Sequence, residues 1–213
     1  MLSSWKKIFS LEDHRASELK NKAALLKMQF YDNDEFGLKD LLSQFEIFEH
    51  RNGEINNILS SGEMDSRNYF FDYQYVVSNG KSSRRIKQSA LFFNCKNLSL
   101  PQFLLRPEQF YDKLLSWLGF EDINFEAHKE FSDKYKLTGE YKDVIKYYFH
   151  KDILDLLSSH TLIHMEGMNY YLVFYSKSQL IPTKMLPSFI HLGNLVYELF
   201  KQRSKSSELE FKI

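Results

Sequence analysis

The chain has 213 residues, of which 43% are hydrophobic, and its 28 basic residues balance its 28 acidic residues. A chain of this length buries a core without help from metal or disulfides, and a net charge of zero removes the overall field that draws proteins to nucleic acid. The single cysteine, Cys95, excludes an internal disulfide framework and predicts the reducing cytoplasm. No apolar run approaches the ~18 residues that a membrane span needs.

Residues 1–30 are predicted to be an N-terminal amphipathic helical segment. Trp5 and Phe9 are four residues apart beside two lysines, a pattern typical of a short helix that rests on a membrane surface. Leu19 and Ala23 continue the helical spacing further along. We therefore expect residues 1–10 to contact a membrane surface.

A β-hairpin is the strongest local prediction. Aromatic and β-branched residues over 69–77 and a second strand-like run ending at Phe93 flank Asn79-Gly80, a pair that accepts the positive φ angles of a tight turn. Alternation places Phe71, Tyr73 and Tyr75 on one face, and we expect this face to lie in the core beneath the C-terminal helix.

The remaining pattern adds shorter elements and one long helix. We expect strands over 28–31, 54–59, 100–105 and 135–137, short helices over 38–45, 144–148 and 153–157, a helix that starts at Pro107, and a second hairpin over 161–175. The apolar residues from Met185 to Phe200 follow a helical period, so a long helix should cross a sheet face.

Together these elements predict an α+β fold. Its antiparallel β-sheet is built from two hairpins, with the long C-terminal helix and the shorter Pro107 helix packed on it. We expect a single α+β domain over residues 31–203. The Ser, Lys and Glu content of residues 204–213 predicts a flexible tail.

Several short motifs follow one another along nearly the whole chain. They include Phe45-Glu46-Ile47-Phe48, Phe71-Asp72-Tyr73, Leu104-Leu105-Arg106-Pro107-Glu108, Leu137-Thr138-Gly139 and Glu166-Gly167. In their order the chain resembles a widespread family of uncharacterised bacterial proteins, domains of unknown function. The resemblance implies a domain that often follows an N-terminal membrane anchor, of which the first residues here show no sign. It implies no activity, catalytic residue or cofactor.

Asp72 and Arg106 are the two charges that we expect to meet. Asp72 lies among aromatic residues in the middle of a strand, and a buried carboxylate without a partner is costly. A guanidinium pairs well with it through two parallel hydrogen bonds. We favour a structural ion pair of Arg106 with Asp72 or Glu108 over a site in which Arg106 binds a small anionic ligand.

Lys81, Arg84 and Arg85 gather at the tip of the first hairpin. Basic residues beside exposed rings bind single-stranded nucleic acid or an anionic membrane. A solvated tip that keeps the strands from pairing with another chain explains them more simply. Because the rest of the chain does not add to this charge, we do not predict nucleic acid as a partner.

His164 and Glu166 share one face of a predicted strand, so a metal site is conceivable there. The helical spacing that fixes two histidines and a glutamate in known zinc sites is absent, and we predict no metal site. The sequence also has no nucleophile elbow and no glycine-rich phosphate loop. We therefore predict no cofactor and no catalytic residue.

These observations predict a non-catalytic interaction or sensing domain that attaches peripherally to a membrane. Its partner would be a protein, a small anionic ligand or a membrane surface, and the sequence leaves its oligomeric state open. The alternative is a hydrolase that uses Asp, Glu and His side chains from loops.

Overall fold

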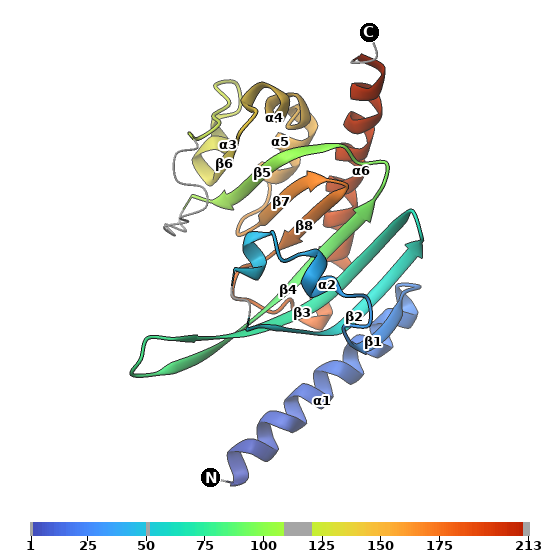
Figure 1. Cartoon of the computed structure of the whole chain (residues 1–213), viewed down its shortest axis with the longest axis vertical. Helices are drawn as coiled ribbons and strands as arrows, with labels where there is room; N and C mark the ends of the chain where they lie inside the picture. The colour runs from blue at the N-terminus through green and yellow to red at the C-terminus, as the bar shows by residue number, and fades with distance from the viewer. Residues whose placement is uncertain (1, 50–51, 109–120, 211–213) are drawn as a thin grey trace.

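The computed structural model describes residues 2–49, 52–108 and 121–210. Within these residues the strands form one eight-stranded antiparallel sheet in the order β1-β2-β3-β4-β8-β7-β5-β6 (Figure 1). The strands are β1 (Gln29–Asn33), β2 (Glu54–Glu63), β3 (Ser66–Ser78), β4 (Ser83–Cys95), β5 (Leu100–Pro107), β6 (Tyr135–Gly139), β7 (His164–Asn169) and β8 (Tyr171–Tyr175). The α+β class is confirmed, but the sheet is larger than two hairpins.

Helices cover both faces of this sheet. They are α1 (Leu2–Leu25), α2 (Leu38–Leu41), η1 (Glu46–Phe48), α3 (Lys129–Lys134), α4 (Lys142–Tyr148), α5 (Lys151–Ser158), η3 (Thr183–Met185) and α6 (Leu186–Glu210). One apolar cluster joins α1, α3 to α6 and one sheet face, and a second joins α2 and η1 to the other face. Strands that are buried on both faces need apolar residues at consecutive positions, which accounts for the aromatic run in β3.

The first predicted hairpin is confirmed as β3 and β4. Their register runs from Ser66 opposite Cys95 to Ser78 opposite Ser83, so four residues form the loop. The turn differs from the tight two-residue turn that we expected, because only Gly80 in the Asn-Gly pair has a positive φ. Asn79 instead accepts hydrogen bonds through its side-chain Oδ1 from the backbone N–H groups of Lys81 and Ser82, at 3.1 and 2.9 Å.

The rings of β3 face the opposite way from our prediction. Phe71, Tyr73 and Tyr75 pack against α2 and η1, and Phe48 lies 4.4 Å from Tyr73 between ring centroids. Phe70 is the ring that faces α6, where it meets Phe189. Alternation separates the two faces of a strand, but it cannot say which face a given helix covers.

The long C-terminal helix α6 is confirmed. It approaches β4 closely at Gly193, where a Cβ atom would lie 2.3 Å from Leu91 Cδ2. The flexible tail expected over 204–213 begins within a helix, because α6 continues to Glu210. Ser204 is buried, and its hydroxyl accepts a hydrogen bond from the backbone N–H of Ser99 at 3.0 Å, which fixes this turn of the helix.

The helix predicted at Pro107 and the second predicted hairpin have different outcomes. Pro107 is the last residue of β5 and not a helix start, and most of the helix predicted to follow it lies outside the described residues. The second hairpin has a two-residue turn, because Met168 pairs with Tyr171 and Asn169 adopts a φ of 53°.

Among the described helices, none is both long enough and apolar enough to cross a membrane.

Helix α1 belongs to the domain for much of its length. Leu19 and Ala23 are buried in the same cluster as the residues of α6. Figure 1 shows that the N-terminal part of α1 extends away from the sheet. The segment predicted over 1–30 is therefore helical to Leu25, and its later turns are part of the core.

Candidate functional site

Asp72 lies in the middle of β3 on the sheet face that α1 covers. It is 4% exposed. Arg15 comes from α1, one and two helical turns before Leu19 and Ala23, so the same helix face carries the guanidinium and the buried apolar residues. The helix that packs on the sheet therefore delivers a cation to a buried carboxylate.

The contacts between Arg15 and Asp72 are short and bidentate. Arg15 Nε donates to Asp72 Oδ2 at 2.6 Å, and Arg15 Nη2 donates to Asp72 Oδ1 at 2.8 Å. Arg15 Nη1 also donates to the backbone carbonyl of Ile181 at 3.0 Å. Two parallel hydrogen bonds between ionised groups are among the strongest polar contacts in proteins.

Two further side chains complete the group. Ser89 lies opposite Asp72 on β4, and its hydroxyl donates to Asp72 Oδ1 at 2.7 Å and accepts from the backbone N–H of Ile181 at 3.0 Å. Asn57 Nδ2 donates to Asp72 Oδ2 at 3.1 Å. We call Arg15, Asn57, Asp72, Ser89 and the backbone of Ile181 the Asp72 network. It joins α1, three strands and the segment before η3.

Asn57 reaches Asp72 from an irregular part of β2. The register between β2 and β3 shifts between Asn56 and Leu59, and Asn57 has a φ of 53°. A bulge of this kind redirects a side chain, and asparagine tolerates the left-handed conformation better than most residues do. The irregular backbone thus supplies a donor to the buried carboxylate.

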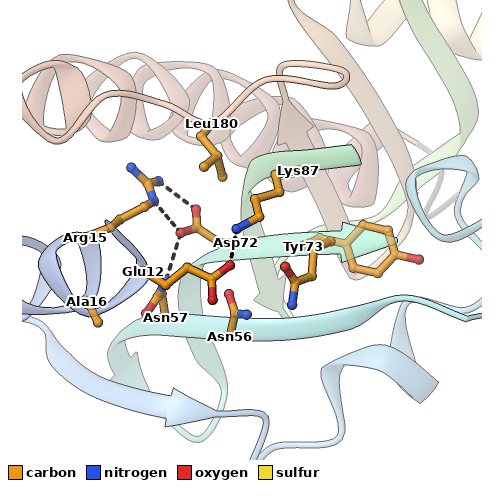
Figure 2. A pocket seen from close by; sticks show the side chains of 10 residues that line it. Glu12, Arg15, Ala16, Asn56, Asn57, Asp72, Tyr73, Lys87 and Leu180 are labelled. Atoms are coloured by element: carbon orange, nitrogen blue, oxygen red, sulfur yellow. Dashed lines mark hydrogen bonds and ion pairs between the residues drawn. The ribbon is translucent and has the colours of Figure 1, made fainter. Parts of the chain in front are cut away.

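A pocket of about 170 Å³ opens beside the Asp72 network, between α1 and the sheet. Figure 2 shows Glu12, Asn56 and Lys87 around it together with Arg15 and Asp72. Lys87 Nζ donates to Glu12 Oε1 at 2.5 Å. Because each cation that lines the pocket is paired with a carboxylate of the pocket, an anionic ligand would meet no surplus of positive charge.

Arg106 does not pair with Asp72, and this prediction is wrong. Arg106 lies on β5, opposite Lys136 of β6. Its positive charge lowers the pKa of Glu46, against the larger effect of burial. Glu108 is exposed, and its backbone N–H donates to the carbonyl of Lys134 at 2.9 Å. Asp72 needed a guanidinium, as expected, but received it from a helix far away in the sequence. The pairing of Arg106 with Glu108 stays a prediction, and an anion held by Arg106 stays the less favoured alternative.

Lys81, Arg84 and Arg85 are all exposed, as their position at the tip of the β3–β4 hairpin predicts. Arg85 Nη1 lies 3.9 Å from Glu12 Oε1 on α1. This contact places the base of the hairpin tip beside α1.

Glu166 forms a second buried polar group, on the opposite sheet face. Its Oε2 accepts from the backbone N–H of Glu46 at 2.6 Å, and its Oε1 accepts from the backbone N–H of Ile47 at 3.1 Å and from the hydroxyl of Tyr175 at 3.0 Å. We call these four residues the Glu166 network. A carboxylate on β7 thus satisfies donors at the start of η1 and holds this turn against the sheet.

Burial sets the protonation of the Glu166 network. Loss of solvent and, to a smaller extent, the nearby Glu46 carboxylate raise the pKa of Glu166, and the three hydrogen bonds oppose both effects, so that the pKa is about 8. Burial also raises the pKa of Glu46, against the pull of Lys177, whose Nζ lies 3.4 Å from Glu46 Oε1.

The metal hypothesis receives no third ligand from the described residues. His164 is buried and stacks on Tyr175 with a centroid distance of 5.1 Å, two residues before Glu166. Across residues 2–49, 52–108 and 121–210, no three His, Cys, Asp or Glu side chains lie close enough together to hold a metal ion. Glu166 uses its carboxylate for backbone and tyrosine donors instead.

Comparison with known proteins identifies the fold and goes no further. No family model and no curated protein matches the chain. A solved structure with a similar fold is that of the mycobacterial trehalose monomycolate transport factor A, with a TM-score of 0.59 and 8% sequence identity. The alignment covers 88% of this chain and 93% of the transport factor chain.

Proposed function

We propose that this protein is a non-catalytic interaction domain that fixes α1 against its sheet and presents the N-terminal half of that helix to a membrane surface. The observation that carries the proposal is the Asp72 network. It attaches α1 to the sheet and to the backbone of Ile181 at Arg15, while the helix continues beyond the sheet toward its start (Figure 1).

A buried ion pair of this kind is an effective way to fix the position of a helix. If the helix shifted by one turn, Asp72 would stay in the core without a counter-charge, and an uncompensated buried charge costs about 3–5 kcal/mol. Apolar burial of Leu19 and Ala23 adds stabilisation but is less demanding of geometry. The combination favours one position of α1 on the sheet.

The part of α1 before Glu12 carries the sequence features of a membrane contact. Trp5 and Phe9 are four residues apart, Lys6 and Lys7 lie between them, and no acidic residue precedes Glu12. Helices with this composition bind at the boundary between lipid headgroups and acyl chains. The similar fold occurs in a protein described as a transport factor, which agrees with a non-catalytic role without identifying a cargo.

The hydrolase alternative has less support. It requires Asp, Glu and His side chains on loops, whereas Asp72, His164 and Glu166 are buried in strands. The oxygens of Asp72 and Glu166 accept hydrogen bonds from groups of the protein itself. A catalytic role would require these contacts to open toward a substrate.

A vesicle flotation assay tests the proposal. The intact protein should float with vesicles of phosphatidylcholine and phosphatidylserine, and the variant Trp5→Ser/Phe9→Ser should lose most of this binding because it loses the apolar contact. The control is Leu25→Ser, which removes an apolar side chain that is 76% exposed at the other end of the same helix. Equal flotation of the intact protein and the double variant would contradict the proposal.

A further inference from the structure

The tip of the β3–β4 hairpin forms an arm that is separate from the rest of the sheet. We call residues 76–85 the arm, and every one of them is exposed. Its strands stay paired to the end, with Val77 opposite Arg84 and Ser78 opposite Ser83. Figure 1 shows the arm extending from the sheet as a two-stranded ribbon. It is therefore a formed element that presents a defined surface.

The composition of the arm is one-sided in charge. It contains Lys81, Arg84 and Arg85 and no acidic residue, and the chain has no Asp or Glu at all between Tyr73 and Pro107. The whole chain is neutral, so this stretch is a strong local segregation of charge.

The arm also has an apolar part beside its basic residues. Val76 and Val77 are each 40% exposed. Packing in the core does not account for these two valines, because Tyr75 is the last residue of β3 that belongs to the core. Basic and apolar side chains together are the composition that an anionic lipid surface accepts.

Contacts at Glu12 place the arm beside the projecting half of α1. Lys87 Nζ donates to Glu12 Oε1, and Arg85 Nη1 lies 3.9 Å from the same oxygen. In Figure 1 the N-terminal end of α1 and the arm both extend from the sheet toward the lower left. The two basic segments therefore start from neighbouring points and leave the domain on one side.

We infer that the arm and the N-terminal half of α1 form a single two-point contact surface for a bilayer that contains anionic phospholipids. The inference rests on the proposed function, because it takes α1 as the first contact and adds the arm as the second. Each Lys or Arg near an anionic bilayer contributes attraction that falls off within a Debye length. Two weak contacts on one rigid domain bind more strongly than either contact alone.

A single strand of nucleic acid fits the arm less well. Such strands are held by basic residues together with exposed rings on which the bases stack. The ring that directly precedes the arm on β3 is that of Tyr75, which is only 6% exposed and packs against Tyr73. The exposed apolar side chains of the arm are valines, which insert among lipid headgroups but give bases no stacking platform.

The test compares two triple variants of the full chain. In the arm variant, Lys81, Arg84 and Arg85 are changed to Ser. In the control variant, the exposed Lys39, Lys129 and Lys146 are changed to Ser, which removes the same charge from other parts of the molecule. Flotation is measured with vesicles of phosphatidylcholine alone and of phosphatidylcholine with phosphatidylserine at a ratio of about seven to three.

We expect the arm variant to bind the anionic vesicles at least about tenfold more weakly than the intact protein, while the control variant binds within about twofold of it. Near-ultraviolet circular dichroism should show both variants folded. Equal losses in the two variants would indicate an effect of net charge and would overturn the inference.

Three other results would also overturn it. If the arm variant floats as well as the intact protein while Trp5→Ser/Phe9→Ser does not, α1 binds alone and only the proposed function stands. If the intact protein binds a single-stranded oligonucleotide and not the anionic vesicles, the surface serves nucleic acid. Loss of binding in the arm variant with normal binding of Trp5→Ser/Phe9→Ser would show that the arm binds alone, which overturns both the two-point surface and the proposed role of α1.

Discussion

Two buried carboxylates attach two different elements to opposite faces of one sheet. Asp72 holds α1 through the guanidinium of Arg15, whereas Glu166 holds η1 through backbone N–H groups and lies near a second carboxylate, that of Glu46. The comparison shows that a carboxylate can fix an element either by pairing with a cation or by accepting neutral donors. The raised pKa of Glu166 makes the attachment of η1 depend on pH near neutrality.

The largest loss of stability should come from breaking the ion pair between Arg15 and Asp72. Asp72→Asn keeps the shape of the side chain but leaves the guanidinium of Arg15 without its counter-charge. The side chain of Arg15 is only 17% exposed, so solvent would compensate this charge poorly. We expect the free energy of unfolding to fall by about 3–5 kcal/mol, measured by urea denaturation. Asp65→Asn is the control, because Asp65 pairs with Lys96 at the surface. A loss no greater than that of the control would contradict the assigned role of Asp72.

The Glu166 network should make the free energy of unfolding depend on pH. The pKa of Glu166 rises from its ordinary value of 4.5 to about 8 on folding. Its stabilising contribution is therefore fully present below pH 4.5 and is lost as the pH rises through 8, with a slope of about 1.4 kcal/mol per pH unit at most. We expect Glu166→Gln to flatten the fall in the free energy of unfolding between pH 5 and 8. Parallel curves for the variant and the intact protein would show that Glu166 does not titrate in this range.

The smallest loss of stability is expected at Ser89, an uncharged side chain of the Asp72 network. Ser89→Ala removes one donor to Asp72 and the acceptor for the backbone N–H of Ile181. We expect a loss of about 1–2 kcal/mol in the free energy of unfolding, because the hydrogen bonds of Ser89 to Asp72, to Arg15 Nη2 and to the backbone N–H of Ile181 are lost while the Arg15–Asp72 ion pair remains. Ser17→Ala on the exposed side of α1 is the control and should change stability little. A loss as large as that of Asp72→Asn would mean that the hydroxyl, and not the ion pair, holds the segment before η3.

The demand of Asp72 for a guanidinium could be predicted from the sequence, but the identity of its partner could not. A carboxylate among rings requires a cation, and Arg106 was the arginine that ended another strand. The signal for Arg15 was present, since it extends the spacing of Leu19 and Ala23 by one turn. Spacing alone cannot tell a buried arginine from a solvated one when the element against which the helix packs is unknown.

Strands were easier to predict than the turns and faces that connect them. The Asn79-Gly80 pair predicts a tight turn, yet the side chain of Asn79 closes a four-residue loop, while Asn169 supports the two-residue turn of the second hairpin. Glu166 lies within β7, but its neighbours in the sequence do not reveal what its carboxylate contacts. Two of its three donors come from η1, and sequence patterns contain no information about such distant contacts.

Hydrogen exchange of the amides of α1 tests most directly whether Arg15 fixes this helix to the sheet. In the full-length Arg15→Met variant we expect the amides of residues 12–25 to exchange about tenfold faster or more than in the intact protein, while those of β3 and β4 keep their rates. Unchanged rates in α1, or equal acceleration in α1 and β4, would contradict the account, because the ion pair would then not be what positions the helix.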